Sequence, residues 1–246
     1  MTRLLASVNS VYEALLAAEN GVDFIDLKNP AEGALGALPP TLITAIVQAL
    51  DGRGTLSATI GDLPMQPDLL CRQVKAISDT GVDIIKIGFF GRENHRLCME
   101  SLAVHARHKR LIAVFLADQG FDPGALRALR EAGFYGAMLD TADKSGGRLT
   151  QWTTIQRLQE FIASAHRSGL ICGLAGSLSL EDVPLLKGIG ADFLGFRRAL
   201  CVGRDRTAGL DPLILRDLKR LLHKCDISAP GIHIGVGEMH HSHCIG

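Results

Sequence analysis

Short runs rich in β-branched residues alternate with longer amphipathic stretches, and this alternation most limits how the chain can fold. The candidate strands are Leu4–Val8, Asp23–Lys28, Thr55–Ile60, Asp83–Gly88, Leu111–Leu116, Tyr135–Asp140, Leu170–Ala175 and Asp192–Phe196. Helical patterns follow them at Ser10–Asn20, Pro40–Leu50, Pro67–Thr80, Asn94–His108, Pro123–Ala132, Thr153–Ser168, Leu180–Ile189 and Pro212–His223. Because parallel strands need long crossover connections, this spacing predicts a parallel sheet.

Eight strand–helix units in a chain of 246 residues predict an α/β protein with a TIM (β/α)8 barrel in a single domain. A doubly wound sheet is the alternative, but no glycine-rich dinucleotide motif follows the first strand, where Val8–Val11 stands. A helix–glycine–strand phrase recurs at Asn20–Asp23, Thr80–Asp83 and Ile189–Asp192, as is typical of repeated units.

The pattern stops near residue 225, where Ala229-Pro230-Gly231 interrupts it and scattered glycines follow. We therefore expect residues 1–225 to form the barrel and residues 226–246 to form a loose C-terminal tail. The tail carries His240, His241, His243 and Cys244, but their spacing fits no standard structural metal site. We expect no bound metal.

Composition excludes several classes of function. The 26 basic residues balance 26 acidic residues, so the chain has no strong basic field for nucleic acid or an anionic membrane. No apolar run reaches the roughly 18 residues of a spanning helix, and no signal-peptide pattern opens the chain. Six scattered cysteines without a CxxC pair indicate reduced thiols in a cytoplasmic protein. The helical exterior leaves homo-oligomer formation open.

Charged residues stand near the ends of three predicted strands. Lys28, Lys86 and Asp140 lie on the strand faces opposite the aliphatic residues, which are expected to pack on the surrounding helices. Inward side chains from alternate strands form one layer of a TIM barrel, so these three are expected to meet at its mouth. Asp26 and the hydroxyls of Ser57 and Thr59 are expected beside or just below them.

Two lysines and a carboxylate in one buried layer are either structural ion pairs or a functional site, since buried charge is costly unless it is paired or used. Two close ammonium groups repel, so one of them should lose its proton more easily. A neutral lysine attacks an aldehyde or ketone to form an imine, and the other two groups can then carry protons. This pattern indicates carbonyl chemistry rather than hydrolysis.

A phosphate site is expected beside this layer. Gly176 and Ser177 follow the seventh strand and precede a helical pattern, and Arg197 follows the eighth strand. Loops after strands seven and eight of TIM barrels often bind phosphate through backbone amides at a helix start. The segment Gly203-Arg204-Asp205-Arg206 either adds a second cationic contact or is a solvated loop, and Gly61-Asp62 is either a turn or a substrate contact. Cys172 and Cys201 are expected to be packing residues.

Several stretches are similar to one known family. They are Asp26–Gly36, Ser57–Asp62, Ile85–Gly88, Met138–Ala142 with Lys144, and Leu174–Ser177, with Gly195, Arg197, Gly203, Asp205 and Arg206 beyond them. On these motifs the sequence resembles the (5-formylfuran-3-yl)methyl phosphate synthases of methanofuran-type cofactor biosynthesis. The resemblance runs from about the first strand to about residue 224.

The resemblance implies a TIM-barrel lyase that joins two molecules of glyceraldehyde 3-phosphate, with loss of one phosphate and two waters. It implies that Lys28 forms a Schiff base and that Lys86 and Asp140 carry protons, with Asp26 and Lys144 assisting. No organic cofactor or metal is implied. The residues alone leave two alternatives: a Schiff-base aldolase acting on a phosphorylated sugar, and a non-catalytic barrel that binds a sugar phosphate.

Overall fold

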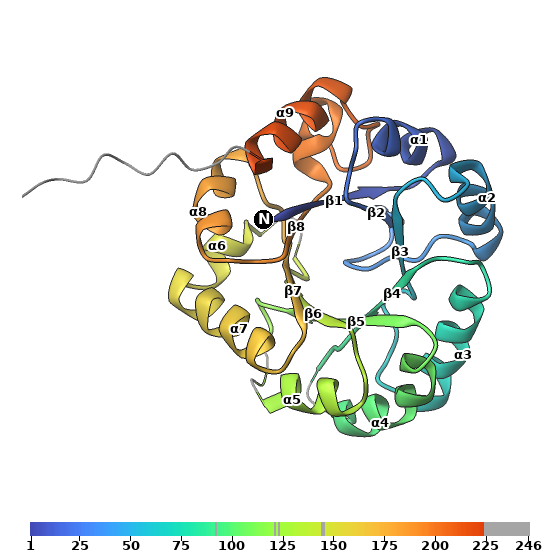
Figure 1. Ribbon diagram of the computed structural model, residues 1–246. Helices are drawn as coiled ribbons and strands as arrows, with labels where there is room; N and C mark the ends of the chain where they lie inside the picture. The colour runs from blue at the N-terminus through green and yellow to red at the C-terminus, as the bar shows by residue number, and fades with distance from the viewer. Residues whose placement is uncertain (92, 121, 123, 144–145, 224–246) are drawn as a thin grey trace, which may run out of the picture.

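The computed structural model describes residues 1–91, 93–120, 122, 124–143 and 146–223. Eight parallel strands form a closed barrel in sequence order, with β8 pairing back onto β1, and the helices surround it (Figure 1). The strands are β1 (Arg3–Val8), β2 (Phe24–Leu27), β3 (Thr55–Thr59), β4 (Ile84–Gly88), β5 (Arg110–Leu116), β6 (Gly136–Asp140), β7 (Ile171–Leu174) and β8 (Phe193–Phe196). The predicted TIM barrel is confirmed, and the doubly wound alternative is excluded because the sheet has no open edge.

The outer helices largely follow the predicted ranges. They are α1 (Val11–Glu19), α2 (Pro40–Leu50), α3 (Pro67–Ser78), α4 (His95–Ala106), α5 (Gly124–Glu131), α7 (Ile155–Arg167), α8 (Val183–Gly188) and α9 (Pro212–His223). The sequence pattern missed the one-turn α6 (Leu149–Trp152) and the 3₁₀ turns Arg198–Leu200 and Val202–Arg204. A further 3₁₀ turn, Leu180–Asp182, occupies the start of the predicted eighth helical stretch. Pieces this short carry too little periodicity to be recognised.

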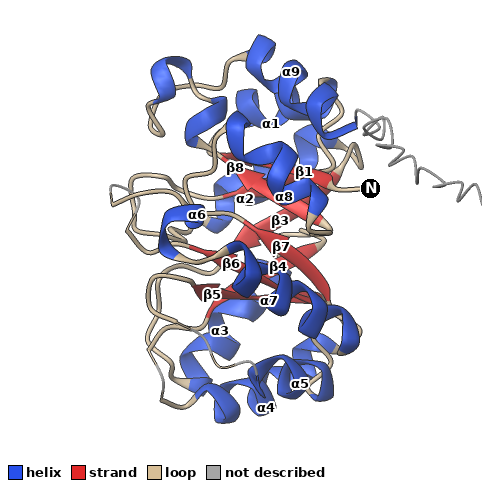
Figure 2. Ribbon diagram, turned by 90° about the vertical axis from the view of Figure 1, so that its left-hand side faces the viewer, coloured by secondary structure: helices blue, strands red, loops and turns tan. Residues whose placement is uncertain are grey.

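Apolar side chains fill two separate layers. The larger core lies between the sheet and the helices and contains the outward residues of the strands, such as Ile25 and Leu27 of β2. The smaller core fills the inside of the barrel, where Phe24 and Phe193 pack with ring centroids 5.4 Å apart. Figure 2 shows the sheet enclosed between helices on either side. The polar residues of the site therefore rest on a packed interior rather than on a pore.

The recurring glycine phrase ends in an aspartate that joins neighbouring strands. Asp23, Asp83 and Asp192 each stand just before an even-numbered strand and accept a backbone N–H from the second residue of the preceding strand. The N–H···Oδ2 distances are 2.7 Å from Leu4, 2.8 Å from Leu56 and 2.7 Å from Cys172, respectively. This carboxylate joint ties strand starts in pairs at the end of the barrel opposite the site.

Among the residues that the structure describes, no helix is both long enough and apolar enough to cross a membrane. The predicted tail, residues 226–246, lies outside the described residues, as do its histidines and Cys244.

The carboxylate joint can be tested at Asp83. Replacing Asp83 with Ala removes the acceptor of the Leu56 amide, and we expect the free energy of unfolding to fall by about 1–3 kcal/mol in urea denaturation. Asp79→Ala is the matched control, because Asp79 makes only an exposed ion pair with Lys75 at 2.8 Å, which should contribute less than about 1 kcal/mol. Equal losses of unfolding free energy in the two variants would contradict a stabilising role for the Asp83 carboxylate.

Candidate active site

A pocket opens at the carboxyl end of the barrel, where the strands end and their connecting loops begin. Charged and hydroxyl side chains from six strand ends and the loops after them reach it: Ser7, Asp26, Lys28, Lys86, Asp140, Ser177, Arg197, Arg198 and Arg206. The walls also include Leu5 and Met138 of the barrel interior. The predicted lysines and aspartates therefore share one pocket, as the alternation along the strands indicated.

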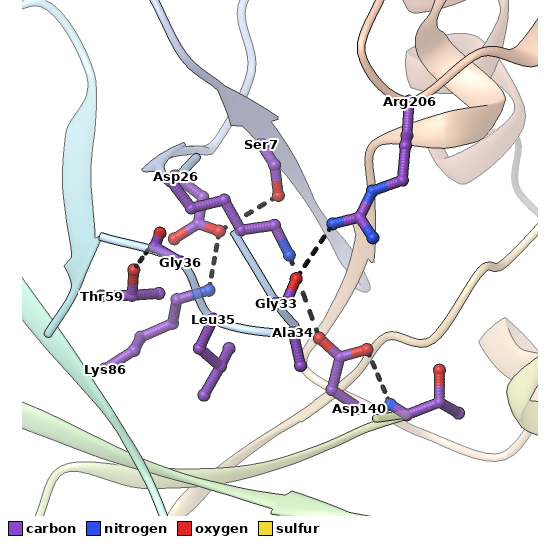
Figure 3. Close-up of polar contacts among 12 residues, drawn as sticks. Ser7, Asp26, Gly33, Ala34, Leu35, Gly36, Thr59, Lys86, Asp140 and Arg206 are labelled. Atoms are coloured by element: carbon purple, nitrogen blue, oxygen red, sulfur yellow. Dashed lines mark hydrogen bonds and ion pairs between the residues drawn. The ribbon is translucent and has the colours of Figure 1, made fainter. Parts of the chain in front are cut away.

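Lys86 is held by a buried ion pair with Asp26. Lys86 Nζ lies 2.7 Å from Asp26 Oδ2, and the two side chains are 2% and 0% exposed. Asp26 also accepts hydrogen bonds from Ser7 Oγ at 3.1 Å, as Figure 3 shows, and from Ser57 Oγ at 2.6 Å. Both carboxylate oxygens of Asp26 are thus engaged, and this fixes where the amine of Lys86 stands.

Lys28 lies against Asp140 on the other side of the pocket. Lys28 Nζ is 4.0 Å from Asp140 Oδ2, and the side chains are 9% and 3% exposed. Asp140 Oδ1 accepts the backbone N–H of Thr141 at 2.8 Å, which orients the carboxylate. The separation of 4.0 Å is longer than a direct hydrogen bond. The structure therefore pairs each of the two amines with a different carboxylate.

The loop after Lys28 folds back over the barrel mouth. Asp62 accepts the backbone N–H groups of Ala34 and Leu35, each at 2.8 Å. Leu35 is 1% exposed and packs on the apolar interior of the barrel. The carbonyl of Gly36 accepts a hydrogen bond from Thr59 Oγ1 at 2.9 Å. Of the two readings of Gly61-Asp62, the structure supports neither a simple turn nor a substrate contact, because Asp62 anchors this loop.

Gly176 and Ser177 line the pocket on the β7 side. Gly176 has a φ of +116°, and a Cβ there would stand 2.8 Å from Thr141 Cγ2, so only glycine fits beside the strand end that carries Asp140. Ser177 has a φ of +49°, which is uncommon for a residue with a side chain. The helical pieces that follow are a 3₁₀ turn and the six-residue α8, so a long helix dipole is not available here.

Arg197, which was expected to contact the substrate phosphate, lines the pocket but is bonded mainly to the protein itself. Its guanidinium donates to Glu13 Oε2 at 2.6 Å and to the carbonyl oxygens of Ser7 at 3.1 Å, Arg206 at 2.8 Å and Ala208 at 2.8 Å. These bonds use four of the five N–H donors of Arg197 within the protein, which favours a structural role over the expected contact to substrate phosphate. Arg197 instead ties β8 to α1 and shapes the loop that carries Arg206. From sequence, a buried structural arginine is hard to tell from a ligand-binding one.

Arg206 is the cation that the sequence left undecided. It is half-buried, lines the pocket, and donates from Nη2 to the carbonyl of Gly33 at 3.3 Å (Figure 3). Burial lowers the pKa of Arg206 below its ordinary value, and the nearby charge of Asp140 opposes that shift. Arg206 therefore faces the substrate space rather than a solvated loop.

Lys144, predicted to assist, lies outside the described residues. Within the described part of the chain, no group of three or more His, Cys, Asp or Glu side chains could hold a metal ion.

Cys172 and Cys201 are both fully buried. Burial raises the pKa of each thiol, to about 11 for Cys201, although the charge of Arg197 partly opposes the shift there. Cys201 Sγ also donates to the carbonyl of Arg197 at 3.2 Å. These features suit packing residues rather than nucleophiles, because the thiolate is the reactive form.

Alkylation tests this assignment of the cysteines. At pH 8 about a thousandth of a thiol with such a pKa is ionised, so iodoacetamide should leave Cys172 and Cys201 unlabelled in the folded protein. Peptide mapping by mass spectrometry should find both labelled after unfolding. Rapid labelling of either residue in the native protein would contradict the assignment.

The loop over the barrel mouth is tested by two glycine substitutions with matched backbone angles. Gly33 has a φ of +66° and its added Cβ would overlap Asp62 Oδ2, whereas Gly21 has a φ of +68° and open space around it. Gly21→Ala should cost about 1 kcal/mol of unfolding free energy and leave activity unchanged. Gly33→Ala should lower the unfolding free energy by more than this and should reduce catalysis, because the Asp62 side chain that anchors the loop must move. Equal activities of Gly33→Ala and Gly21→Ala in a turnover assay would contradict a functional role for the loop over the barrel mouth.

The fold and the site together define a TIM-barrel enzyme with two lysine amines and two carboxylates at the mouth of its barrel. A profile of the 4-HFC-P synthase family matches residues 4–219. The chain therefore belongs to the 4-HFC-P synthase family.

Two relatives agree with this placement, and one solved structure shares the fold. The chain is 38% identical over 232 residues to the (5-formylfuran-3-yl)methyl phosphate synthase of Methanocaldococcus jannaschii, covering 89% of this chain and 98% of the relative. It is 37% identical over 218 residues to the synthase of Methanococcus maripaludis strain C5, covering 84% and 92%. The crystal structure of 3-hexulose-6-phosphate synthase from Salmonella typhimurium superposes with a TM-score of 0.66 at 17% identity, covering 90% of this chain and 98% of that one. At that identity the structural likeness supports the fold alone.

Proposed function

We propose that the protein is a (5-formylfuran-3-yl)methyl phosphate synthase, a carbon–oxygen lyase of methanofuran-type cofactor biosynthesis. It condenses two molecules of glyceraldehyde 3-phosphate and releases one phosphate and two waters. The observation that carries the proposal is the buried pairing of Lys28 with Asp140 at 4.0 Å, beside a second amine held by Asp26. The relatives bear this name, and the chain covers nearly all of their length.

Lys28 is the proposed nucleophile. Its neutral amine attacks the aldehyde carbon of one triose phosphate, and loss of water gives an imine. The protonated imine withdraws electrons from the neighbouring carbon, so that carbon can lose its proton, and the resulting enamine supports phosphate elimination or aldol addition to the second triose. Hydrolysis of the final imine takes up the water released at the start, so the Schiff base does not alter the overall balance.

Asp140 and Lys86 are the proposed proton carriers. Asp140 lies against Lys28, so its carboxylate can accept the proton from the carbon beside the imine. Lys86, as the ammonium paired with Asp26, can donate a proton to a developing alkoxide or to a departing hydroxyl group. Asp26 is a positioning residue in this scheme, since both of its oxygens already hold protein donors. Loss of two waters makes the ring aromatic, which drives the condensation forward.

The substrate is a small phosphorylated aldehyde. Gly176 and Ser177 provide a close-approaching backbone for its phosphate, and Lys144 remains an expected contact by its motif. The four cysteines of the described chain, Cys71, Cys98, Cys172 and Cys201, are free thiols, which supports our further proposal that the enzyme works in the cytoplasm. The proposed steps use side chains alone.

Borohydride trapping tests the Schiff base. With glyceraldehyde 3-phosphate and borohydride, the wild-type protein should gain the mass of one reduced triose phosphate on Lys28, and without borohydride it should produce a furan chromophore. Lys28→Ala should lose the adduct and lower turnover by at least about a thousandfold. Lys75→Ala is the control, because Lys75 is an exposed helix residue.

Each alternative predicts a different result. An adduct that persists in Lys28→Ala would relocate the site, and a sugar bisphosphate as the sole product would identify an aldolase. Absence of any adduct on the wild-type protein would leave a binding barrel without covalent catalysis.

A further inference from the structure

Arg206 is a cation inside the pocket whose charge has no close carboxylate partner. Among the residues that the structure describes, its guanidinium makes one hydrogen bond, to the carbonyl of Gly33, at the weak distance of 3.3 Å. No carboxylate of the described chain lies within 4.0 Å of it, although Asp140 and Asp62 act on its charge from further away. A half-buried guanidinium held only by a neutral carbonyl is ready to accept an anion.

The backbone around Arg206 is held in place by hydrogen bonds from Arg197. Arg197 donates from Nε to the carbonyl of Arg206 at 2.8 Å and from Nη2 to the carbonyl of Ala208 at 2.8 Å. Arg197 is itself fixed by an ion pair with Glu13 at 2.6 Å, and both side chains are almost fully buried. A buried ion pair thus holds the backbone on both sides of Thr207 and presents Arg206 to the pocket.

The chemistry of the substrate places an anion near this guanidinium. In a triose phosphate bound to Lys28 as an imine, the phosphorus atom lies within about 5 Å of the imine carbon, because only four bonds separate them. Lys28, Asp140, Ser177 and Arg206 line the same pocket. The phosphate carries negative charge and is repelled by Asp140, so it requires a cation within this pocket, and Arg206 is such a cation.

We propose that Arg206 binds the phosphate of the triose that is attached to Lys28, exchanging its weak bond to the Gly33 carbonyl for charge-assisted bonds to the phosphate. This inference rests on the proposed function, because it names the phosphate contact of the Schiff-base substrate. Release of Gly33 also couples phosphate binding to the loop after β2, which Asp62 continues to hold at Ala34 and Leu35. Arg206 takes the role that the sequence pattern suggested for Arg197.

The test compares two aldehydes that differ only in the phosphate. Borohydride trapping on Lys28 is measured against concentration for glyceraldehyde 3-phosphate and for glyceraldehyde, and the ratio of half-saturating concentrations gives the preference for phosphate. Arg206→Gln should reduce this preference about 10- to 100-fold, by weakening capture of the phosphorylated substrate while leaving glyceraldehyde almost unaffected. Arg206→Lys should retain part of the preference, since it keeps the charge but not the planar fork.

Arg204→Gln is the matched control, because Arg204 lies two residues earlier in the same loop and is exposed outside this pocket. It should leave the preference unchanged. An equal loss for both aldehydes in Arg206→Gln would show that Arg206 only latches the loop, and an unchanged preference would overturn the proposal outright. If Arg206→Gln does not fold, as judged by thermal unfolding, the Arg206→Lys comparison decides between the same outcomes.

A second measurement separates failure of this proposal from failure of the proposed function. If the wild-type protein forms no adduct with either aldehyde, the Schiff-base function is wrong. Titration calorimetry with inorganic phosphate then still tests Arg206: the wild-type protein should bind phosphate at least about tenfold more tightly than Arg206→Gln. Equal affinities, or no binding by the wild-type protein, would overturn the assignment of Arg206.

Discussion

The ion pair between Lys86 and Asp26 is the interaction on which the upper half of the barrel depends. Two opposite charges that are almost wholly removed from water are tolerated only because they lie 2.7 Å apart and the carboxylate accepts two further hydroxyl hydrogen bonds. The arrangement joins β1, β2, β3 and β4 around one carboxylate. It creates a rigid polar floor on which the Lys28 amine and the loop above it can be placed.

The pocket is closed by carboxylates and cations that act on backbone rather than on substrate. Asp62 holds the loop after β2, Asp118 accepts the amides of Ala142 and Asp143 in the loop after β6, and Arg197 holds the loop after β8. Three loops from different strands are thus fixed by charged groups from neighbouring segments. The geometry of the reacting groups therefore depends on these anchors as well as on the strand ends.

Strand order, barrel closure and the meeting of Lys28, Lys86 and Asp140 followed from the sequence, because a period of two and a fixed fold place inward residues at the mouth. The sequence did not predict which group each charged side chain contacts. Whether Arg197 binds phosphate or Glu13 depends on contacts across 184 residues of chain, which no local pattern records. Asp62 was likewise ambiguous, since its role depends on how a twelve-residue connection folds back; its glycines indicated a turn but not its direction.

The carboxylate joints at Asp23, Asp83 and Asp192 add a side-chain contact to the backbone pairing of neighbouring strands. They join β1 to β2, which share four aligned residues, β3 to β4, which share three, and β7 to β8, which share two. Between β5 and β6, where five residues align, Tyr135 stands in place of the acid. Among these four pairs of an odd-numbered strand with the next strand, the pair without a carboxylate joint has the longest ladder, so the joints add a contact where fewer aligned residues hold the two strands together.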